Sequence, residues 1–306
     1  MAQKKILGSI GIGVFFLLAG ELSVLFGITP LKIWVTPFCW TGYIFLVDSY
    51  LYQKKGYSLI QNEGGRFLLT LPLSTGLWLI FEGYNLLLKN WEYLNIPESP
   101  LLAYPGYFWS FATILPALLE TNALLEAWGL FKKFRVKPSV LPKKALLFSF
   151  LLGLVFLIYP LVSRSVYDFP PVWLGFIFLL EPFNYQFGGE SLLKRLERGE
   201  GERLFTLLLS GGVMGLLWEF WNFWAEAKWI YHIPDPTGLK IFEMPLLGFL
   251  GFFPFAVEFY VMYQSILLLF RPYKQYPFDA REISPQFRFP VLSQPSPEGR
   301  GPTESR

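Results

Sequence analysis

Eight apolar blocks, each long enough to cross a lipid bilayer, are the feature of this sequence that most constrains its fold. A hydrocarbon core about 30 Å thick takes roughly 20 helical residues, and such blocks separated by short charged clusters are typical of a multi-pass membrane protein. The blocks are residues 7–28, 33–52, 67–88, 104–131, 145–163, 171–187, 204–225 and 244–270. The sequence therefore predicts an all-α fold, a polytopic membrane helical bundle with eight transmembrane helices.

The composition excludes several kinds of site. Only 16% of the 306 residues are charged, whereas a soluble domain has about 25%. The single cysteine, Cys39, excludes an intrachain disulfide and a cysteine metal cluster, and the single histidine, His232, excludes a His-rich di-iron site. No Gly-rich phosphate-binding loop is present. We therefore expect no metal and no cofactor, and the net charge of +3 requires no nucleic-acid partner.

The distribution of Lys and Arg predicts the orientation. With a cytoplasmic N-terminus, 21 of the 26 basic residues fall on the cytoplasmic side of eight spans, as the positive-inside rule requires. Both termini are then cytoplasmic, and we expect the protein in the cell membrane. The final stretch, 272–306, is rich in Pro, Gly and Ser and predicts a disordered cytoplasmic tail.

The sequence repeats itself. The segment "LLWEFWNFWAEAKWIYHIP" (216–234) matches "LIFEGYNLLLKNWEYLNIP" (79–97) at an offset of about 137 residues. The matched pairs are Glu82 with Glu219, Asn85 with Asn222, Trp91 with Trp229, Tyr93 with Tyr231, Asp48 with Glu181, Arg66 with Arg203, Pro116 with Pro254, and Glu120 with Glu258. Because acids, an amide and prolines recur in the same order, we interpret the pattern as an internal duplication.

The duplication predicts two tandem four-helix repeats. The first repeat covers 1–131 and the second 145–271, and a basic cytoplasmic linker, 132–144, joins them. Since four is an even number of spans, both repeats have the same orientation, and their pseudo-twofold axis runs along the membrane normal. Pro116 and Pro254 precede Glu120 and Glu258 by one turn, and they predict helix kinks there.

Polar residues inside the spans form two tiers. At 1.5 Å per residue, Glu82 and Glu219 lie roughly 22 Å from the cytoplasmic ends of their helices, in the outer third of the membrane. The predicted outer tier contains Glu82, Asn85, Glu219, Asn222 and Glu243, and the predicted inner tier contains Asp48, Glu120, Glu181 and Glu258. An ionisable group within a span is costly, so it normally faces the bundle interior or marks a functional site.

Each tier has a functional and a structural interpretation. The outer tier supplies candidate catalytic residues: Glu219 and Glu243 as acid and base, Asn222 as a group that orients one of them, and Glu82 and Asn85 as their counterparts. The neighbouring aromatic residues Trp218, Phe220, Trp221 and Tyr231 are candidate substrate-binding residues. The alternative is that these polar residues only hydrogen-bond between helices and fix the packing. For the inner tier the structural interpretation is the stronger one.

At these residues the chain distantly resembles the lycopene cyclase-domain family of small membrane proteins. The resemblance rests on an acid that ends one span (Asp48, Glu181), a basic residue that opens the next (Arg66, Arg203), and an acid near that span's outer end (Glu82, Glu219). Trp91–Tyr93 and Trp229–Tyr231 then follow as W-x-Y. The family resemblance implies a cofactor-free, isomerising cyclisation, in which a carboxylic acid protonates an alkene and aromatic faces stabilise the cation.

Three functions remain open at this point. The first is an enzyme that acts on a membrane-dissolved isoprenoid or other lipid, as the resemblance implies. The second is a proton-coupled transporter in which the two acid tiers form a relay, and the third is a non-catalytic membrane scaffold. The expected partner is a membrane lipid or polyprenoid, and assembly into a homo-oligomer is left open.

Overall fold

The computed structural model describes residues 2–233 and 238–270, and within them the protein is mostly helical. The elements of the first half are α1 (Ala2–Leu25), α2 (Thr29–Lys32), α3 (Val35–Lys55), α4 (Leu59–Asn62), α5 (Gly64–Leu88), β1 (Trp91–Leu94), α6 (Pro100–Ala112) and α7 (Ile114–Trp128). Those of the second half are α8 (Lys143–Ser163), η1 (Val166–Asp168), α9 (Val172–Gln186), α10 (Leu192–Glu197), α11 (Glu202–Trp224), β2 (Lys228–Tyr231), β3 (Lys240–Ile241), β4 (Met244–Pro245), η2 (Leu246–Gly251) and α12 (Phe252–Leu269). The disordered tail expected at 272–306 lies outside the described residues.

Within the described residues, six helical segments are long and apolar enough to cross a membrane, which fits a multi-pass membrane protein. They are Gln3–Leu25, Gly64–Leu88, Pro100–Trp128, Lys143–Ser163, Glu202–Trp224 and Leu246–Leu269. The other two expected spans correspond to α3 and α9. The 21 residues of α3 include Asp48 and several hydroxyl side chains, and α9 has only 15 residues, or about 22 Å.

Two features depart from a purely helical bundle: short strands are present, and the last apolar block is not one helix. Two short antiparallel strand pairs, β1–β2 and β3–β4, occur among the described residues. Block 244–270 begins as β4 and η2, and Pro254 lies in the first turn of α12, where a missing N–H costs nothing. Pro116 instead removes the donor for the carbonyl of Ala112, and α6 ends at that residue. The expected kink therefore occurs at Pro116 but not at Pro254.

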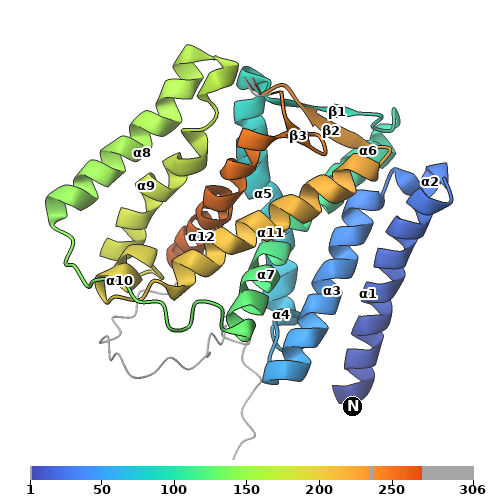
Figure 1. The fold of residues 1–306 in the computed structure, drawn as a ribbon, viewed down its shortest axis with the longest axis horizontal. Coiled ribbons are helices and arrows are strands. Elements are labelled where there is room, and N and C mark those ends of the chain that lie inside the picture. Colours follow the sequence, from blue (N-terminus) through green and yellow to red (C-terminus); the bar gives the residue numbers. More distant parts are fainter. Residues whose placement is uncertain (1, 234–237, 271–306) are drawn as a thin grey trace, which may run out of the picture. The chain divides into compact units, whose positions relative to one another are not determined.

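Glycines let α1 pack closely on α3, and α8 on α9 (Figure 1). A Cβ atom at Gly42 of α3 would lie 2.7 Å from the backbone nitrogen of Leu17 in α1. A Cβ atom at Gly153 of α8 would lie 2.8 Å from the Cα atom of Leu179 in α9. These contacts are closer than real Cβ atoms allow, so a side chain at either glycine would push the two helices apart. Small residues serve this purpose in membrane helix pairs.

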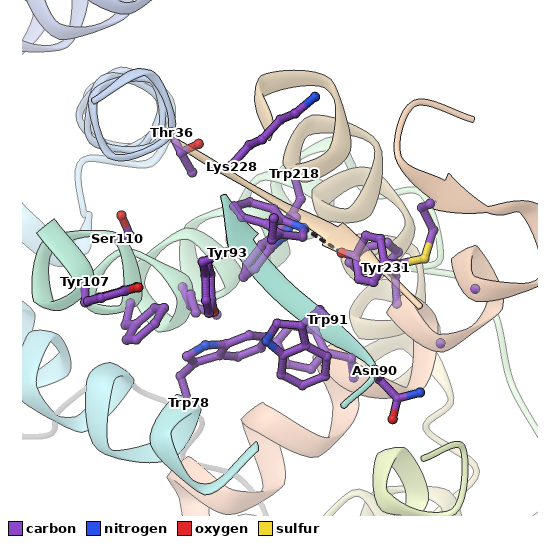
Figure 2. A pocket seen from close by; sticks show the side chains of 18 of the residues that line it. Thr36, Trp78, Asn90, Trp91, Tyr93, Tyr107, Ser110, Trp218, Lys228 and Tyr231 are labelled. Atoms are coloured by element: carbon purple, nitrogen blue, oxygen red, sulfur yellow. Dashed lines mark hydrogen bonds between the residues drawn. The ribbon is translucent and has the colours of Figure 1, made fainter. Parts of the chain in front are cut away.

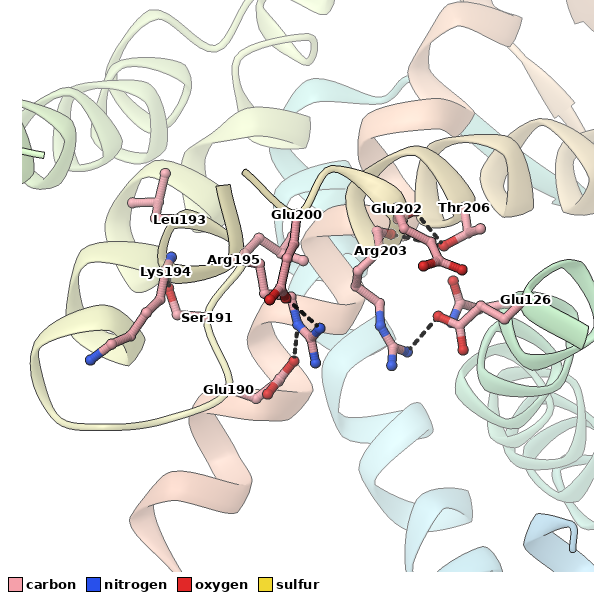
Figure 3. Close-up of polar contacts among 12 residues, drawn as sticks. Glu126, Glu190, Ser191, Leu193, Lys194, Arg195, Glu200, Glu202, Arg203 and Thr206 are labelled. Atoms are coloured by element: carbon pink, nitrogen blue, oxygen red, sulfur yellow. Dashed lines mark hydrogen bonds and ion pairs between the residues drawn. The ribbon is translucent and has the colours of Figure 1, made fainter. Parts of the chain in front are cut away.

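Two arginines tie the halves together at the end of the bundle where α4 and α10 lie (Figure 1). Arg66 of α5 donates to the hydroxyl of Tyr263 in α12 at 3.0 Å. Arg203 of α11 forms an ion pair with Glu126 of α7 at 3.1 Å, beside a separate cluster in which Arg195 contacts Glu190 and Glu200 (Figure 3). Each arginine thus reaches from its own half into the last helix of the other half.

Strands β1 and β2 join the halves at the opposite end of the bundle, where α2 also lies (Figure 1). Trp91 pairs with Tyr231, and Tyr93 pairs with Trp229. In the sequence repeat, Trp91 corresponds to Trp229 and Tyr231 corresponds to Tyr93, so the two pairs are equivalent. The register is therefore that of two equivalent strands related by a twofold rotation. We call this two-stranded element, residues 91–94 and 228–231, the ribbon.

Candidate functional site: an aromatic cavity at the ribbon

A cavity of about 550 Å³ lies between the halves, and the ribbon forms part of its wall. Further wall residues come from the start of α3, from α6, from the segment around η1, and from η2 and the start of α12. Binding sites for small molecules commonly measure about 300–1,000 Å³. The cavity is therefore large enough for a ligand, and two halves are needed to build it.

Aromatic rings make up most of the wall that Figure 2 displays. Tyr107 and Ser110 lie on one side of this view and Tyr231 on the other, with Trp78 and Trp91 between them (Figure 2). Few polar side chains reach the wall; they are those of Thr36, Asn90, Tyr93, Tyr107, Ser110, Tyr167, Lys228 and Tyr231. This lining suits a mainly apolar ligand with few polar groups.

Glu82 lies directly behind the cavity wall in the first half. Its Oε1 atom accepts hydrogen bonds from the indole nitrogens of Trp78 and Trp91 at 2.8 and 3.1 Å. The same oxygen accepts the hydroxyl hydrogen of Tyr93 at 2.5 Å. Three donors thus converge on one carboxyl oxygen, which acts as the acceptor toward all of them. Glu82 thus reaches the cavity only through the three aromatic residues that line it.

Glu219 occupies the matching place in the second half, with a different set of contacts. Its Oε1 atom accepts from the hydroxyl of Tyr231 at 2.7 Å, and that hydroxyl accepts from the indole nitrogen of Trp229 at 2.8 Å. The side chain of Glu219 is fully buried, and within the described residues its Oε2 atom has no hydrogen-bond partner. We call Glu82 with Tyr93, and Glu219 with Tyr231, the two dyads.

Both dyad tyrosines are held in the protonated form. Burial, and then the neighbouring Glu82 carboxyl, raise the pKa of Tyr93 well above its usual value. Burial, and then Glu219, do the same to the pKa of Tyr231. The phenol groups that face the cavity are therefore hydrogen-bond donors at neutral pH.

Asn85 and Asn222 hold the ribbon in place and do not line the cavity. The side-chain oxygen of Asn222 accepts from the backbone nitrogen of Trp229 at 2.9 Å, and its amide nitrogen donates to the carbonyl of Trp229 at 2.8 Å. Asn85 makes the same two bonds to Trp91, at 3.0 and 2.9 Å. Because the Glu and the Asn are three residues apart, they lie on one face of their helix. The Asn binds the strand, and the tyrosine of that strand meets the Glu.

Apart from Tyr231, the remaining outer candidates belong to neither dyad. Glu243 forms an ion pair with Lys228, which lines the cavity, at 2.5 Å. Of the four aromatic candidates, Trp218 and Tyr231 line the cavity, whereas Phe220 is partly exposed and packs on Phe242. Trp221 donates from its indole nitrogen to Glu21 of α1 at 2.9 Å.

The inner candidates do not line the aromatic cavity. Asp48 accepts from the backbone nitrogen of Ile60 at 2.7 Å, and Glu181 accepts from the backbone nitrogens of Leu192 and Leu193 at 3.2 and 3.1 Å. The two acids therefore bind the starts of α4 and α10. Glu258 accepts from the backbone nitrogen of Phe176 at 3.1 Å. A smaller cavity of about 290 Å³ includes Glu181 in its wall.

The residues predicted for the site from the sequence do not include Trp78, Trp91, Tyr93, Lys228 and Trp229, all of which line the cavity. Tyr93 matches Tyr231 in the repeat, so the sequence held a signal for it. Trp78 had no such signal, because its counterpart at the same offset is Gly215. Lys228 reads as an outer loop residue in the sequence, and only the fold of the ribbon brings it to the wall.

Comparison of the chain with family models, with curated proteins and with solved structures finds no match.

Proposed function

We propose that this protein is a cofactor-free membrane enzyme that isomerises or cyclises an isoprenoid lipid bound in the aromatic cavity. The observation that carries this proposal is the pair of dyads: two carboxyls, each hydrogen-bonded to a tyrosine hydroxyl on the wall of one cavity. The resemblance to the lycopene cyclase-domain family supports the same class of reaction.

The proposed membrane arrangement has eight spans in two tandem repeats of the same orientation, with α3 and α9 as spans. The twofold register of the ribbon, the glycine contacts of α1–α3 and α8–α9, and the reciprocal contacts of Arg66 and Arg203 support it. Both termini are then cytoplasmic, and the ribbon and its cavity lie toward the outer face. A lipid ligand would enter the cavity from the bilayer.

The aromatic wall supplies what a carbocation needs. The rings of Trp78 and Trp218, both on the cavity wall, have centroids 5.5 Å apart. Indole faces attract cations through their quadrupole, and the attraction grows where water is excluded. Such a wall stabilises a positive charge that develops on an apolar chain.

The two dyads supply a proton donor and a proton acceptor. Glu219 acts as the acid through Tyr231, whose hydroxyl is bonded to its Oε1 atom. In the reacting state the protonated Oε1 atom donates to the Tyr231 oxygen, and the Tyr231 hydroxyl gives its own proton to an alkene carbon, where a C–H bond forms and a carbocation remains. Glu82 acts as the base through Tyr93, because its Oε1 atom accepts the Tyr93 hydroxyl hydrogen and two indole N–H groups.

The reaction balances without any oxidant or reductant. One proton enters at one carbon, and one proton leaves from another as a new C=C bond forms. A double-bond shift or a ring closure results, and the product has the mass of the substrate. After each turnover the proton is on the Glu82 side, and exchange with water returns it to Glu219.

The test is lipid extraction and mass spectrometry from cells that express the protein and receive a panel of carotenoid and polyprenoid precursors. We expect a new isomer of one precursor with the wild type, and its loss with Glu219→Gln and with Tyr231→Phe. Glu226→Gln is the matched control. Glu226 forms an ion pair with Lys32, with 3.4 Å between Oε2 and Nζ, and it belongs to neither dyad. A folded wild type that yields no isomer from any precursor would contradict the proposal and favour transport or a scaffold role.

A further inference from the structure

Eight side chains with a hydroxyl, amide or ammonium group line the aromatic cavity, and three of these groups are held by acids of the protein. Tyr93 and Tyr231 donate from their hydroxyls to the dyad acids. The ammonium of Lys228 binds Glu243 and lies over the ring of Phe223, 5.6 Å from its centroid. These three groups therefore already have a strong hydrogen-bond acceptor inside the protein.

Three further groups are buried within the wall or lie at its edge. Oγ1 of Thr36 and Oδ1 of Asn90 are buried, so a ligand in the cavity does not reach them. The amide nitrogen of Asn90 donates to the carbonyl of Val166 at 2.8 Å. Tyr167 is 70% exposed, so it lies at the open edge of the cavity.

The hydroxyls of Tyr107 and Ser110, one turn apart on α6, are the two that remain. Both residues are only partly buried, and within the described part of the chain neither hydroxyl makes a hydrogen bond. The hydroxyl of Tyr107 points from α6 toward Tyr93 (Figure 2), and the two rings meet edge to face with centroids 5.4 Å apart. The cavity thus offers a hydrogen-bonding phenol beside the first dyad that no protein group occupies.

The charges around Tyr107 limit the kind of ligand group that fits there. The sequence of α6 contains no charged residue, and Lys228, the only charged residue among the described wall residues, is already paired. The carboxyl of Glu82 lies behind Tyr93. A phosphate or carboxylate beside Tyr107 would therefore be a charge in an apolar cavity without a counter-ion, which is costly. A neutral hydroxyl or carbonyl oxygen needs only a hydrogen bond, which a phenol supplies.

We propose that the ligand of the cavity is an isoprenoid that carries a neutral oxygen, as a hydroxyl or carbonyl, and that Tyr107 binds this oxygen. This inference rests on the proposed function, because it names the substrate class of the same cavity. The oxygen-bearing end lies at α6, with Ser110 as a second hydroxyl beside it, and the apolar chain extends across Trp78 and Trp91 toward Tyr231 (Figure 2). Tyr107 is a binding residue that sets specificity, and the dyads carry out the proton transfers.

A binding titration, followed by the tryptophan fluorescence of the purified full chain in detergent, tests this inference. The probes are geranylgeraniol, its monophosphate, and the hydrocarbon with the same isoprenoid chain and no hydroxyl. We expect geranylgeraniol to bind more tightly than the other two probes. Tyr107→Phe should weaken the binding of geranylgeraniol about fivefold, as expected for the loss of one neutral hydrogen bond, and it should leave the binding of the hydrocarbon unchanged.

Tyr104→Phe is the matched control. Tyr104 lies one turn before Tyr107 on α6, is 71% exposed and does not line the cavity, so this variant should bind all three probes as the wild type does. Tyr107→Phe keeps the ring that packs on Tyr93 and Phe111, so we expect it to fold. Tighter binding of the hydrocarbon or the monophosphate, failure of the wild type to bind geranylgeraniol, or equal affinity of wild type and Tyr107→Phe for this alcohol would overturn the inference.

The binding titration and the isomer assay fail independently of each other. Binding of geranylgeraniol that depends on Tyr107, together with no isomer in the lipid extracts, would support the ligand class and contradict the proposed reaction. An isomer formed from a hydrocarbon precursor, with the same yield in Tyr107→Phe as in wild type, would support the reaction and overturn the ligand class.

Discussion

Asn222 binds both backbone polar groups of Trp229, and through them it fixes the strand that carries Tyr231. A helix and a strand are thereby locked in one relative position. The hydroxyl of Tyr231 then meets Glu219, which lies one turn before Asn222 on the same helix. Asn85 and Trp91 repeat the arrangement in the first half. The two dyads thus depend on two asparagines that do not touch the cavity.

Asn222→Ala should therefore destabilise the protein. The substitution leaves the N–H and C=O groups of Trp229 without their partner, at about 1–3 kcal/mol for each buried group. Chemical unfolding in detergent measures the loss. Asn222→Asp keeps the acceptor and loses the donor, so its free energy of unfolding should fall between those of wild type and Asn222→Ala. Equal stability of all three proteins would contradict the clamp.

The dyad tyrosines predict a loss of stability at alkaline pH. Their pKa values in the folded protein are raised by burial and then by the neighbouring acids, whereas in the unfolded chain tyrosine has a pKa of about 10. The contribution of a raised pKa is fully present below the unfolded value and is lost as pH rises toward the folded value. Above pH of about 10, the free energy of unfolding should fall by about 1.4 kcal/mol per pH unit for each dyad tyrosine.

Tyr231→Phe removes one of these two contributions, so its stability should fall less steeply with alkaline pH than that of wild type. Tyr159→Phe serves as the control, because Tyr159 is 51% exposed. Parallel pH profiles for wild type and Tyr231→Phe would show that Tyr231 ionises in the folded protein as it does in the unfolded chain.

The sequence repeat predicted which residues occupy equivalent positions in the two halves. It gave no prediction where the two halves differ. Matching of Glu82 with Glu219 and of Asn85 with Asn222 located both dyads on equivalent helices. The three-residue spacing of Glu and Asn did not reveal that the asparagines bind backbone groups. Those bonds depend on the strands that contain Trp91 and Trp229. The ribbon itself was not predicted, since four-residue strands carry too little periodicity to be recognised.

The position of each acid along its helix predicted the two tiers, but it did not predict the hydrogen-bond partners of the acids. Asp48 accepts from the backbone at the start of α4, and Glu181 accepts from the backbone at the start of α10. Trp78 was not predicted, because the equivalent residue in the second half is Gly215. The two halves therefore contribute different side chains to the cavity wall.

The same substitution, Gly→Ala, should have different effects on stability at Gly42 and at Gly11. Gly42→Ala would place a Cβ atom 2.7 Å from the Leu17 nitrogen and 2.8 Å from the Gly13 carbonyl oxygen. We expect a loss of about 1–3 kcal/mol from the resulting overpacking. Gly11→Ala on α1 is the control: no heavy atom lies within 4 Å of its Cβ position, and the higher helix propensity of Ala should leave stability unchanged or improved. Loss of stability in both variants alike would contradict close packing at Gly42.

Ser110→Phe should exclude ligand from the cavity. Ser110 lines the cavity from α6, and a phenyl ring in its place would occupy the space of the ligand. We expect the purified variant to retain about tenfold less co-purified lipid or added isoprenoid in native mass spectrometry, a difference of about 1.4 kcal/mol in binding. Leu101→Phe adds bulk on the same helix at a position that is 85% exposed, so its lipid content should match that of wild type. Unchanged retention in Ser110→Phe would place the ligand elsewhere.

Cysteine labelling distinguishes eight spans from six. In a Cys39→Ser background, Thr29→Cys and Glu98→Cys should react with a membrane-impermeant thiol reagent added to intact cells. Gln53→Cys and Val140→Cys should react only after the cells are permeabilised. Thr29 precedes α3 and Gln53 lies in its last turn, so they lie on opposite sides of the membrane only if α3 crosses it. Equal labelling of these two positions in intact cells would remove α3 from the spans, and labelling of Val140→Cys from outside would invert the proposed orientation.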